Sequence, residues 1–281
     1  MRASRLAVFS LLPVLVAAAP NAYAAAALAP HRAVYDLALD KASERSGITG
    51  LNGRMVYEFN GSPCEGYTVQ FRFVTQIQTN EVSRLTDQQT TTFEDANGKN
   101  FSFVTKSFVD QAPEKEIKGN AELEQDKLVV RIEKPEANTL DLKATQFPTK
   151  HLEELITKAK AGETFYETNL FDGSDDANKV MTTTVIIGKQ QTPEDTDPEK
   201  KVLATLSADQ FWPVDIAYFD ESTEEGEEVP EYRISFKLHE NGMSRDLVMD
   251  YGDFSMKGTL VNLSLLPAPT KAPSCDGKPA P

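Results

Sequence analysis

The segment YTVQFRFVTQIQ, residues 67–78, decides the fold because its apolar and polar side chains alternate. The apolar positions share one face of an extended chain: Tyr67, Val69, Phe71, Phe73 and Ile77. The intervening Thr, Gln and Arg side chains fall on the other face. A period of two over about a dozen residues is typical of a long antiparallel strand with one buried face. The segment therefore predicts a sheet protein.

The same alternation recurs along the chain, at residues 33–39, 128–132, 214–218, 232–238 and 254–260. Turn-forming sequences separate these segments: Asn60-Gly61, Asn97-Gly98, Lys118-Gly119-Asn120, Asp172-Gly173 and Asn241-Gly242. About ten or more strands with short connections make one antiparallel sheet that curls on itself. No change in composition marks a second domain. We predict a mainly β protein, a single open-barrel-like β-spiral domain over residues 25–266.

One segment departs from this pattern. Leu152, Leu155, Ile156 and Ala159 have the spacing of an apolar helical stripe. Thr149 is expected to cap this helix and Gly162 to end it. The amphipathic helix should pack against the inner face of the sheet, either filling the core or covering a ligand cavity. The candidate cavity-lining residues are Tyr67, Phe71, Phe73, Leu152, Leu155, Ile156, Tyr232 and Phe236.

The first 24 residues predict a signal peptide. Arg2 and Arg5 precede an apolar run over residues 6–19, and Ala22-Tyr23-Ala24 offers a cleavage site. The run is shorter than the about 20 residues that a membrane anchor needs. An outer-membrane barrel is disfavoured by the internal helix, the 16 prolines and the Pro-Ala-Pro end. We expect a periplasmic protein that is not transmembrane.

The two cysteines, Cys64 and Cys275, are expected to form a disulfide, because export leads to an oxidising compartment. Two unrelated buried thiols are the alternative. The bridge would tether a proline-rich tail, residues 267–281. This tail is not expected to form regular structure.

The charge balance excludes one class of partner. There are 43 acidic against 29 basic residues, a net charge of −14, which repels nucleic acid. Two acidic stretches, Pro193–Glu199 and Asp220–Glu228, are expected to be solvated hairpin tips.

No catalytic or metal-binding motif emerges. The three histidines, His31, His151 and His239, do not have the spacing of a zinc site. The nucleophile elbow, the P-loop and the dinucleotide-binding glycine motif are absent from the sequence. The acidic segment at residues 172–176 fits an ordinary turn better than a calcium loop. A glycosidase-like pair among the many carboxylates stays open. We expect no enzymatic activity, no cofactor and no metal.

Several segments resemble one family: HRAVYDL (31–37), FPTKH (147–151), LFDGS (170–174), WPV (212–214), YFD (218–220) and SRDLVMDYGD (244–253). With the two cysteine positions, they are similar to the EipB cell-envelope-integrity family of α-proteobacterial periplasmic proteins. The resemblance covers residues 30–275. It implies an incompletely closed spiral sheet around a helix, a Cys64–Cys275 disulfide, and an envelope role without enzymatic activity.

Two functions fit these expectations. The first is a non-enzymatic protein that maintains the cell envelope by binding a periplasmic protein or an envelope component. The second is a carrier of lipid or lipoprotein acyl chains, because an apolar interior binds such chains through the area that it removes from water.

Overall fold

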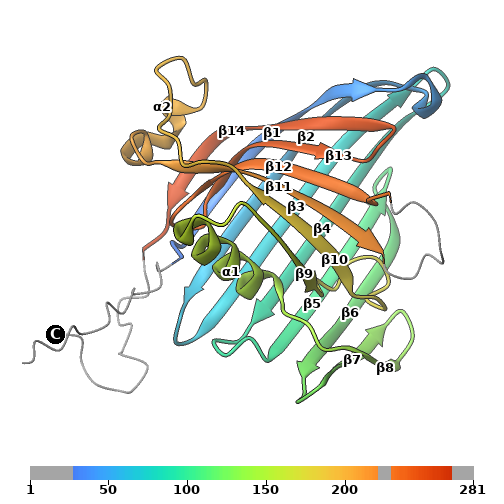
Figure 1. Cartoon of the computed structure of the whole chain (residues 1–281). Helices are drawn as coiled ribbons and strands as arrows, with labels where there is room; N and C mark the ends of the chain where they lie inside the picture. Colours follow the sequence, from blue (N-terminus) through green and yellow to red (C-terminus); the bar gives the residue numbers. More distant parts are fainter. Residues whose placement is uncertain (1–27, 221–228, 268–281) are drawn as a thin grey trace, which may run out of the picture.

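The computed structural model describes residues 28–220 and 229–267. Within these ranges, fourteen strands form one antiparallel sheet in the order β8-β7-β6-β5-β4-β3-β2-β1-β14-β13-β12-β11-β10-β9 (Figure 1). The strands are β1 (His31–Ala42), β2 (Ile48–Ser62), β3 (Gly66–Thr79), β4 (Ser83–Glu94), β5 (Asn100–Val109), β6 (Ala112–Leu123), β7 (Lys127–Lys134), β8 (Asn138–Lys143), β9 (Phe165–Leu170), β10 (Met181–Ile187), β11 (Phe211–Asp220), β12 (Tyr232–His239), β13 (Ser244–Asp250) and β14 (Phe254–Leu265). The predicted mainly β, single curled sheet is confirmed.

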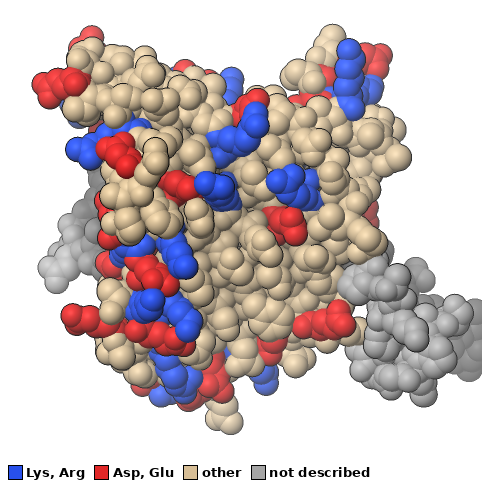
Figure 2. Space-filling model, turned by 180° about the vertical axis from the view of Figure 1, so that it is seen from behind, with Lys and Arg blue, Asp and Glu red and all other residues tan. Residues whose placement is uncertain are grey.

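The alternation of side chains separates an inner from an outer face. The buried side chains Ala33, Tyr35 and Leu37 of β1 point inward. On the outer face, cross-strand ion pairs such as Arg54–Asp36 and Arg72–Asp87 join neighbouring strands. Figure 2 shows the molecule from behind, with positive and negative side chains interspersed. The polar side chains of the alternating strands therefore face solvent on the outer side of the sheet.

The sheet curls until its two edge strands approach each other, but β8 and β9 do not pair. The segment that follows β8 bridges this seam, because Gln146 pairs with Leu170 and the backbone N–H of Phe171 donates to the Gln146 carbonyl at 3.1 Å. Phe147 and Phe171 then pack against Phe101 and Phe103 of β5. Aromatic packing thus fills the seam where strand pairing stops, and the result is a spiral.

Helix α1 (Pro148–Ala161) packs against the inner face, as predicted. Leu155, Ile156 and Ala159 pack with Trp212, Val214 and Ile216 of β11. Gly162 ends the helix with a φ of 78°, a left-handed conformation that suits glycine.

The predicted cap of α1 is wrong. Thr149 lies inside the first turn, and the N-cap position is Phe147, whose side chain cannot accept a hydrogen bond. The Glu94 carboxylate at the end of β4 instead accepts from the backbone N–H groups of Thr149, at 2.7 Å, and Lys150, at 3.1 Å. A distant strand therefore does what a local Ser or Thr usually does for a helix start.

Two predicted turns also lie elsewhere. Asn60-Gly61 belongs to the end of β2, and the turn to β3 follows at residues 63–65. Lys118-Gly119-Asn120 lies inside β6, where a Cβ on Gly119 would come within 2.7 Å of the Phe103 ring. Gly119 is therefore needed for close packing against Phe103. Asn97-Gly98 and Asn241-Gly242 do connect strands, as expected.

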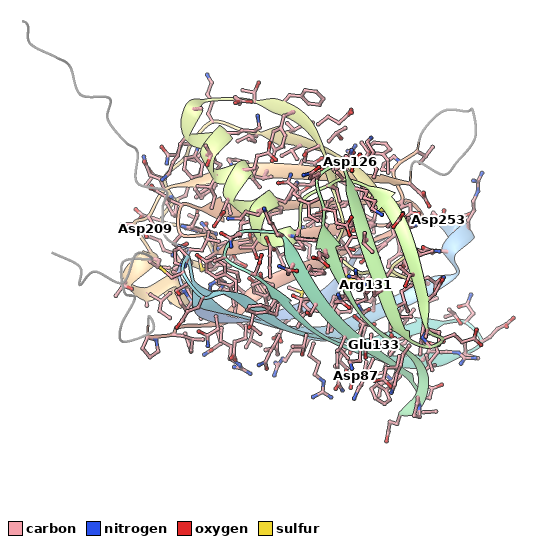
Figure 3. All side chains as sticks on the ribbon, turned by 90° about the horizontal axis from the view of Figure 1, so that it is seen from below. Asp87, Asp126, Arg131, Glu133, Asp209 and Asp253 are labelled. Carbon is pink, nitrogen blue, oxygen red and sulfur yellow. The ribbon has the colours of Figure 1, made fainter. Side chains whose placement is uncertain are left out.

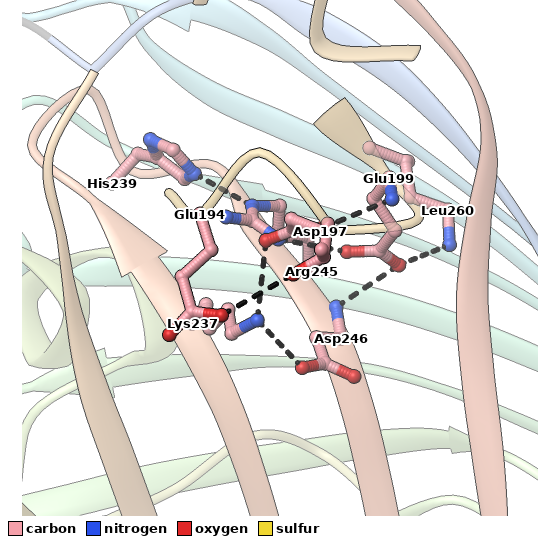
Figure 4. A network of polar contacts seen from close by, with 9 residues as sticks. Glu194, Asp197, Glu199, Lys237, His239, Arg245, Asp246 and Leu260 are labelled. Carbon is pink, nitrogen blue, oxygen red and sulfur yellow. Dashed lines mark hydrogen bonds and ion pairs between the residues drawn. The ribbon is translucent and has the colours of Figure 1, made fainter. Parts of the chain in front are cut away.

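The acidic stretch Pro193–Glu199 is only in part the solvated tip that we expected: Glu194 and Asp195 are exposed, whereas Asp197 and Glu199 turn inward. It leads into the short helix α2 (Lys200–Leu203), which packs on β14. The side chains of Asp197 and Glu199 are 5% and 2% exposed and bind Arg245, which is fully buried (Figure 4). The Glu199 carboxylate also accepts from the backbone N–H of Leu260 at 2.6 Å. This hydrogen bond satisfies a backbone N–H group of β14 beyond the point where β13 pairs with β14.

Several predictions fall outside the described residues: the signal peptide over 1–24, the acidic stretch after Asp220, Cys275 and nearly all of the tail over 267–281. The boundaries of the 25–266 domain and the Cys64–Cys275 disulfide therefore stay predictions. Cys64 lies in the turn between β2 and β3 and is partly exposed. None of the helices in the described ranges is long and apolar enough to cross a membrane.

Candidate binding cavity

The curled sheet encloses a cavity of about 880 Å³. Its walls come from both arms of the sheet, with Tyr35, Phe71 and Phe73 on one arm and Ile234 and Phe236 on the other. Cavities that hold small molecules measure about 300–1,000 Å³. The interior therefore has the size of a ligand site.

The first half of α1 forms the floor of the cavity. Pro148, His151 and Leu152 line it, whereas Leu155 and Ile156 one turn later belong to the packed core. The helix thus does both things that the sequence left open. Its N-terminal half borders the cavity, and its C-terminal half fills the space beneath.

The middle of the cavity is apolar and aromatic. The rings of Phe71 and Phe73 stack with centroids 5.9 Å apart. Met55, Met249 and Leu247 add flexible apolar surface. Tyr35 contributes its ring while its hydroxyl donates to the Ser244 carbonyl at 2.6 Å, and burial raises the pKa of this phenol. This region can remove an apolar group from water and makes few hydrogen bonds available.

The mouth of the cavity is polar. Lys115 at the start of β6, Glu231 next to β12, and Asp172, Ser174 and Asp175 after β9 all line it. Asp175 and Glu231 share Lys179, and Lys115 Nζ donates to the Asp175 carbonyl, so these residues lie together. Asp172 follows Phe171, whose ring packs on Phe147 just before α1. The cavity therefore has an apolar interior and a charged entrance.

The predicted lining residues divide between cavity and core. Phe71, Phe73, Leu152, Tyr232 and Phe236 line the cavity. Tyr67, Leu155 and Ile156 do not; they pack in the cluster beneath α1, where the Tyr67 ring stacks on Phe59 at 4.9 Å. Alternation shows which face of a strand is buried, but not how far along the strand the core ends and the cavity begins.

Sequence reasoning missed the residues of the mouth. Asp172 sits in what reads as an ordinary turn, Tyr251 stands outside the alternating segments, and Tyr218 ends the alternating segment 214–218 but was not assigned to the cavity. Tyr218 and Tyr232 face each other across β11 and β12 with ring centroids 4.3 Å apart. The alternation of Val214, Ile216 and Tyr218 was the one signal that could have indicated this face.

The histidines of the cavity are neutral at physiological pH. Burial lowers the pKa of His31, whose Nδ1 lies 2.7 Å from the Ala29 carbonyl oxygen. Burial also lowers the pKa of His151 to about 4, and its Nε2 lies 3.5 Å from the Thr183 hydroxyl. Neither ring is hydrogen-bonded to a serine or a carboxylate among the described residues. This is not the geometry of an activated nucleophile.

The described part of the chain contains no group of three or more histidine, cysteine or acidic side chains that could hold a metal ion. The cavity thus offers shape, apolar surface and a charged entrance. These features suit binding.

Comparison with known proteins places the chain in a family. A family model described as EipB-like matches residues 22–267. The chain belongs to the EipB-like family. The expected membership is thereby confirmed.

One EipB-like relative is the cell envelope integrity protein EipB of Brucella abortus (strain 2308), 60% identical over 250 residues. The match covers 89% of this chain and 88% of that protein. A solved structure from Brucella abortus, titled as a β-barrel-like protein of domain of unknown function DUF1849, has a TM-score of 0.81 and 60% identity. It covers 85% of this chain and 98% of that one. The spiral sheet is therefore similar to an experimentally determined β-barrel-like fold.

Proposed function

We propose that this protein is a non-enzymatic periplasmic protein that maintains the integrity of the bacterial cell envelope by binding an envelope component or a periplasmic protein. The observation that carries the proposal is the 60% identity, over most of both chains, to a protein named for cell envelope integrity. At this identity the fold and the interior are expected to be shared. The cavity supports binding as the mode of action, because it is large, apolar and has an entrance.

The test is genetic. Deletion of the gene should make cells sensitive to detergents and to antibiotics that act on the cell wall, and the wild-type chain should restore resistance. Met249→Trp and Ile234→Trp, each on the cavity wall, should restore less because an indole occupies the space that a ligand needs.

Ile186→Trp is the matched control, since Ile186 is 52% exposed and does not line the cavity. Circular dichroism should show that all three variants are folded. If the deletion leaves sensitivity unchanged, the envelope role is refuted. If the cavity variants complement as fully as the control, the cavity is not the binding site.

A second candidate is a carrier of lipid or lipoprotein acyl chains. It is favoured by the aromatic and aliphatic wall that Phe71, Phe73 and Phe236 form in the interior. Native mass spectrometry of the purified protein should then show co-purified lipid, which Met249→Trp removes. Absence of lipid, together with no binding of a fluorescent fatty acid, would contradict the carrier.

A further inference from the structure

The two ends of the cavity differ in chemistry, and this difference bears on what the cavity can hold. At the α1 end the titratable residues are His31 and His151, which burial keeps neutral. Four charged side chains line the mouth: Lys115, Asp172, Asp175 and Glu231. A ligand that enters the cavity therefore meets fixed charge at the entrance alone.

Most of the charge at the mouth is already paired. Lys115 forms an ion pair with Asp176 at 2.6 Å. Glu231 and Asp175 bind Lys179 at 2.7 and 3.4 Å. Each lysine near the mouth thus has a carboxylate partner. The described part of the cavity wall offers no free cation to an anionic group.

Asp172 is the exception. Its Oδ1 accepts a hydrogen bond from the backbone N–H of Ser174 at 2.9 Å, and it forms no ion pair with any residue in the described ranges. Burial, and then the negative charge of Asp172, raise the pKa of the Tyr218 and Tyr232 phenols. The negative charge of Asp172 therefore acts on an aromatic wall that includes Tyr218, a residue that also packs against the core cluster beneath α1.

Three tyrosines form this wall. The rings of Tyr218 and Tyr232 stack at 4.3 Å, and the Tyr251 ring lies 6.1 Å from that of Tyr232. All three line the cavity. Aromatic faces attract cations, with an energy that grows when the site is partly desolvated. An uncompensated carboxylate beside them adds attraction of the same sign.

We propose that the mouth binds the cationic head of an amphiphile, an ammonium group held by Asp172 beside the tyrosine wall of Tyr218, Tyr232 and Tyr251, while its alkyl chain extends toward Phe71 and Phe236. The inference rests on the proposed role of the cavity in binding. It adds a preference for ligand charge. An anionic head of the same chain length meets the same apolar walls but is repelled at the entrance.

The experiment measures displacement of a neutral reporter, N-phenyl-1-naphthylamine, from the purified protein. The competitors are dodecyltrimethylammonium and dodecanoate, which share the chain length and differ in charge, both below micelle-forming concentrations. Salt is kept at about 0.15 M, so that charges more than about 8 Å apart are screened. The expected result is that the cation competes at least about tenfold better than the anion.

Asp172→Asn should reduce this preference several-fold, because the amide oxygen keeps the hydrogen bond to Ser174 while the charge is lost. Tyr251→Leu should weaken the cation and leave the anion unchanged. Asp126→Asn is the control for net charge: Asp126 is exposed, is labelled in Figure 3, and lies in the turn between β6 and β7, away from the cavity wall. This variant should behave as wild type.

Each failure has a distinct meaning. If reporter and both competitors fail to bind, the cavity is not a binding site and the mode of action under Proposed function falls as well. If both competitors bind equally, or the anion binds better, the charge preference is refuted and cavity binding stands. If Asp172→Asn and Asp126→Asn change the preference equally, the effect is one of net charge and the assigned mouth is wrong.

Discussion

Arg245 is the largest side chain that this sheet buries completely. Its guanidinium donates to His239 Nε2 at 3.0 Å, to Asp197 Oδ2 at 2.9 Å and to Glu199 Oε2 at 3.1 Å, and it lies 5.0 Å from the Phe211 ring centre (Figure 4). Burial of such a group is unfavourable unless its charge and donors are matched. The acidic stretch before α2 matches the charge through Asp197 and Glu199 and is held against the sheet in return, while Arg245 Nη2 has no hydrogen-bond partner among the described residues.

Replacement of Arg245 by Met should destabilise the protein by about 3–5 kcal/mol, because the buried Glu199 loses its cation and Asp197 keeps only Lys237. Urea denaturation gives the free energy of unfolding. Arg54→Met, which breaks the exposed pair with Asp36, is the matched control and should cost about 0–1 kcal/mol. Similar losses in the two variants would show that the buried network does not stabilise the fold.

His151 should make stability depend on pH. Its pKa is about 4 in the folded state, because of burial, against an ordinary value of 6.5. The unfolded chain binds this proton first as pH falls, so the contribution is fully present above 6.5 and is lost as pH falls toward 4. From the difference between the two pKa values, the stabilisation lost between pH 7 and 5 is about 2 kcal/mol.

His151→Gln should remove this part of the pH dependence of the free energy of unfolding, as measured by urea denaturation between pH 7 and 5. The raised pKa values of Glu94 and Glu199 act in the opposite direction in both proteins, because the folded state holds those protons more tightly as pH falls. They therefore cancel in the comparison. An unchanged slope in the variant would contradict the assignment to His151.

Helix α1 depends on a strand that lies far from it in the sequence. Its first turn has no side-chain cap of its own, and Glu94 of β4 accepts two of its free N–H groups. A carboxylate at this position also interacts favourably with the positive end of the helix dipole. The contact fixes the end of α1 that forms the cavity floor.

Glu94→Ala should cost about 1–2 kcal/mol, the range for loss of a helix cap. The first turn of α1 should exchange its amide hydrogens faster, because Thr149 and Lys150 lose their acceptor. Glu94→Gln should keep part of the stabilisation of the helix start, because its amide oxygen can still accept from these N–H groups. Hydrogen exchange of α1 measures both variants, and equal exchange in Glu94→Ala and wild type would argue against the cap.

The arrangement of the complete sheet brings its first and last strands together. β1 and β14 are neighbours, with His31 opposite Leu265, and His31 also faces Phe59 near the end of β2. The turn that contains Cys64 therefore lies two strands from the end of β14. About ten residues between Leu265 and Cys275 can cross that distance, since strands lie about 4.8 Å apart. The predicted bridge is compatible with the sheet.

Cys275→Ser should lower the melting temperature under oxidising conditions and make residues 267–281 sensitive to protease. The bridge would close a loop of ~210 residues, which limits its stabilisation to about 5 kcal/mol. Limited proteolysis with mass spectrometry locates the cleavage, and reduced wild-type protein is the control. Equal melting temperatures in the oxidised wild type and the variant would mean that the disulfide is absent or has no structural role.

Local patterns in the sequence were sufficient for several strands and for α1. Alternation at residues 67–78 predicts β3, and the stripe from Leu152 to Ala159 predicts α1, because both depend on neighbours along the chain. The Gly119 turn failed for the opposite reason. Gly119 is required because the Phe103 ring of β5 packs directly against it, a contact that no local pattern can show.

The sequence by itself determined the class of fold, the buried faces of the strands and the family. Only the tertiary structure decided that Tyr67, Leu155 and Ile156 belong to the core while Phe71, Phe73 and Phe236 line a cavity. It also decided that Glu94, Asp172 and Glu199 have partners or roles far from their own turns. The physical reason is that burial of a face follows from each strand alone, whereas the space left inside depends on how tightly fourteen strands curl.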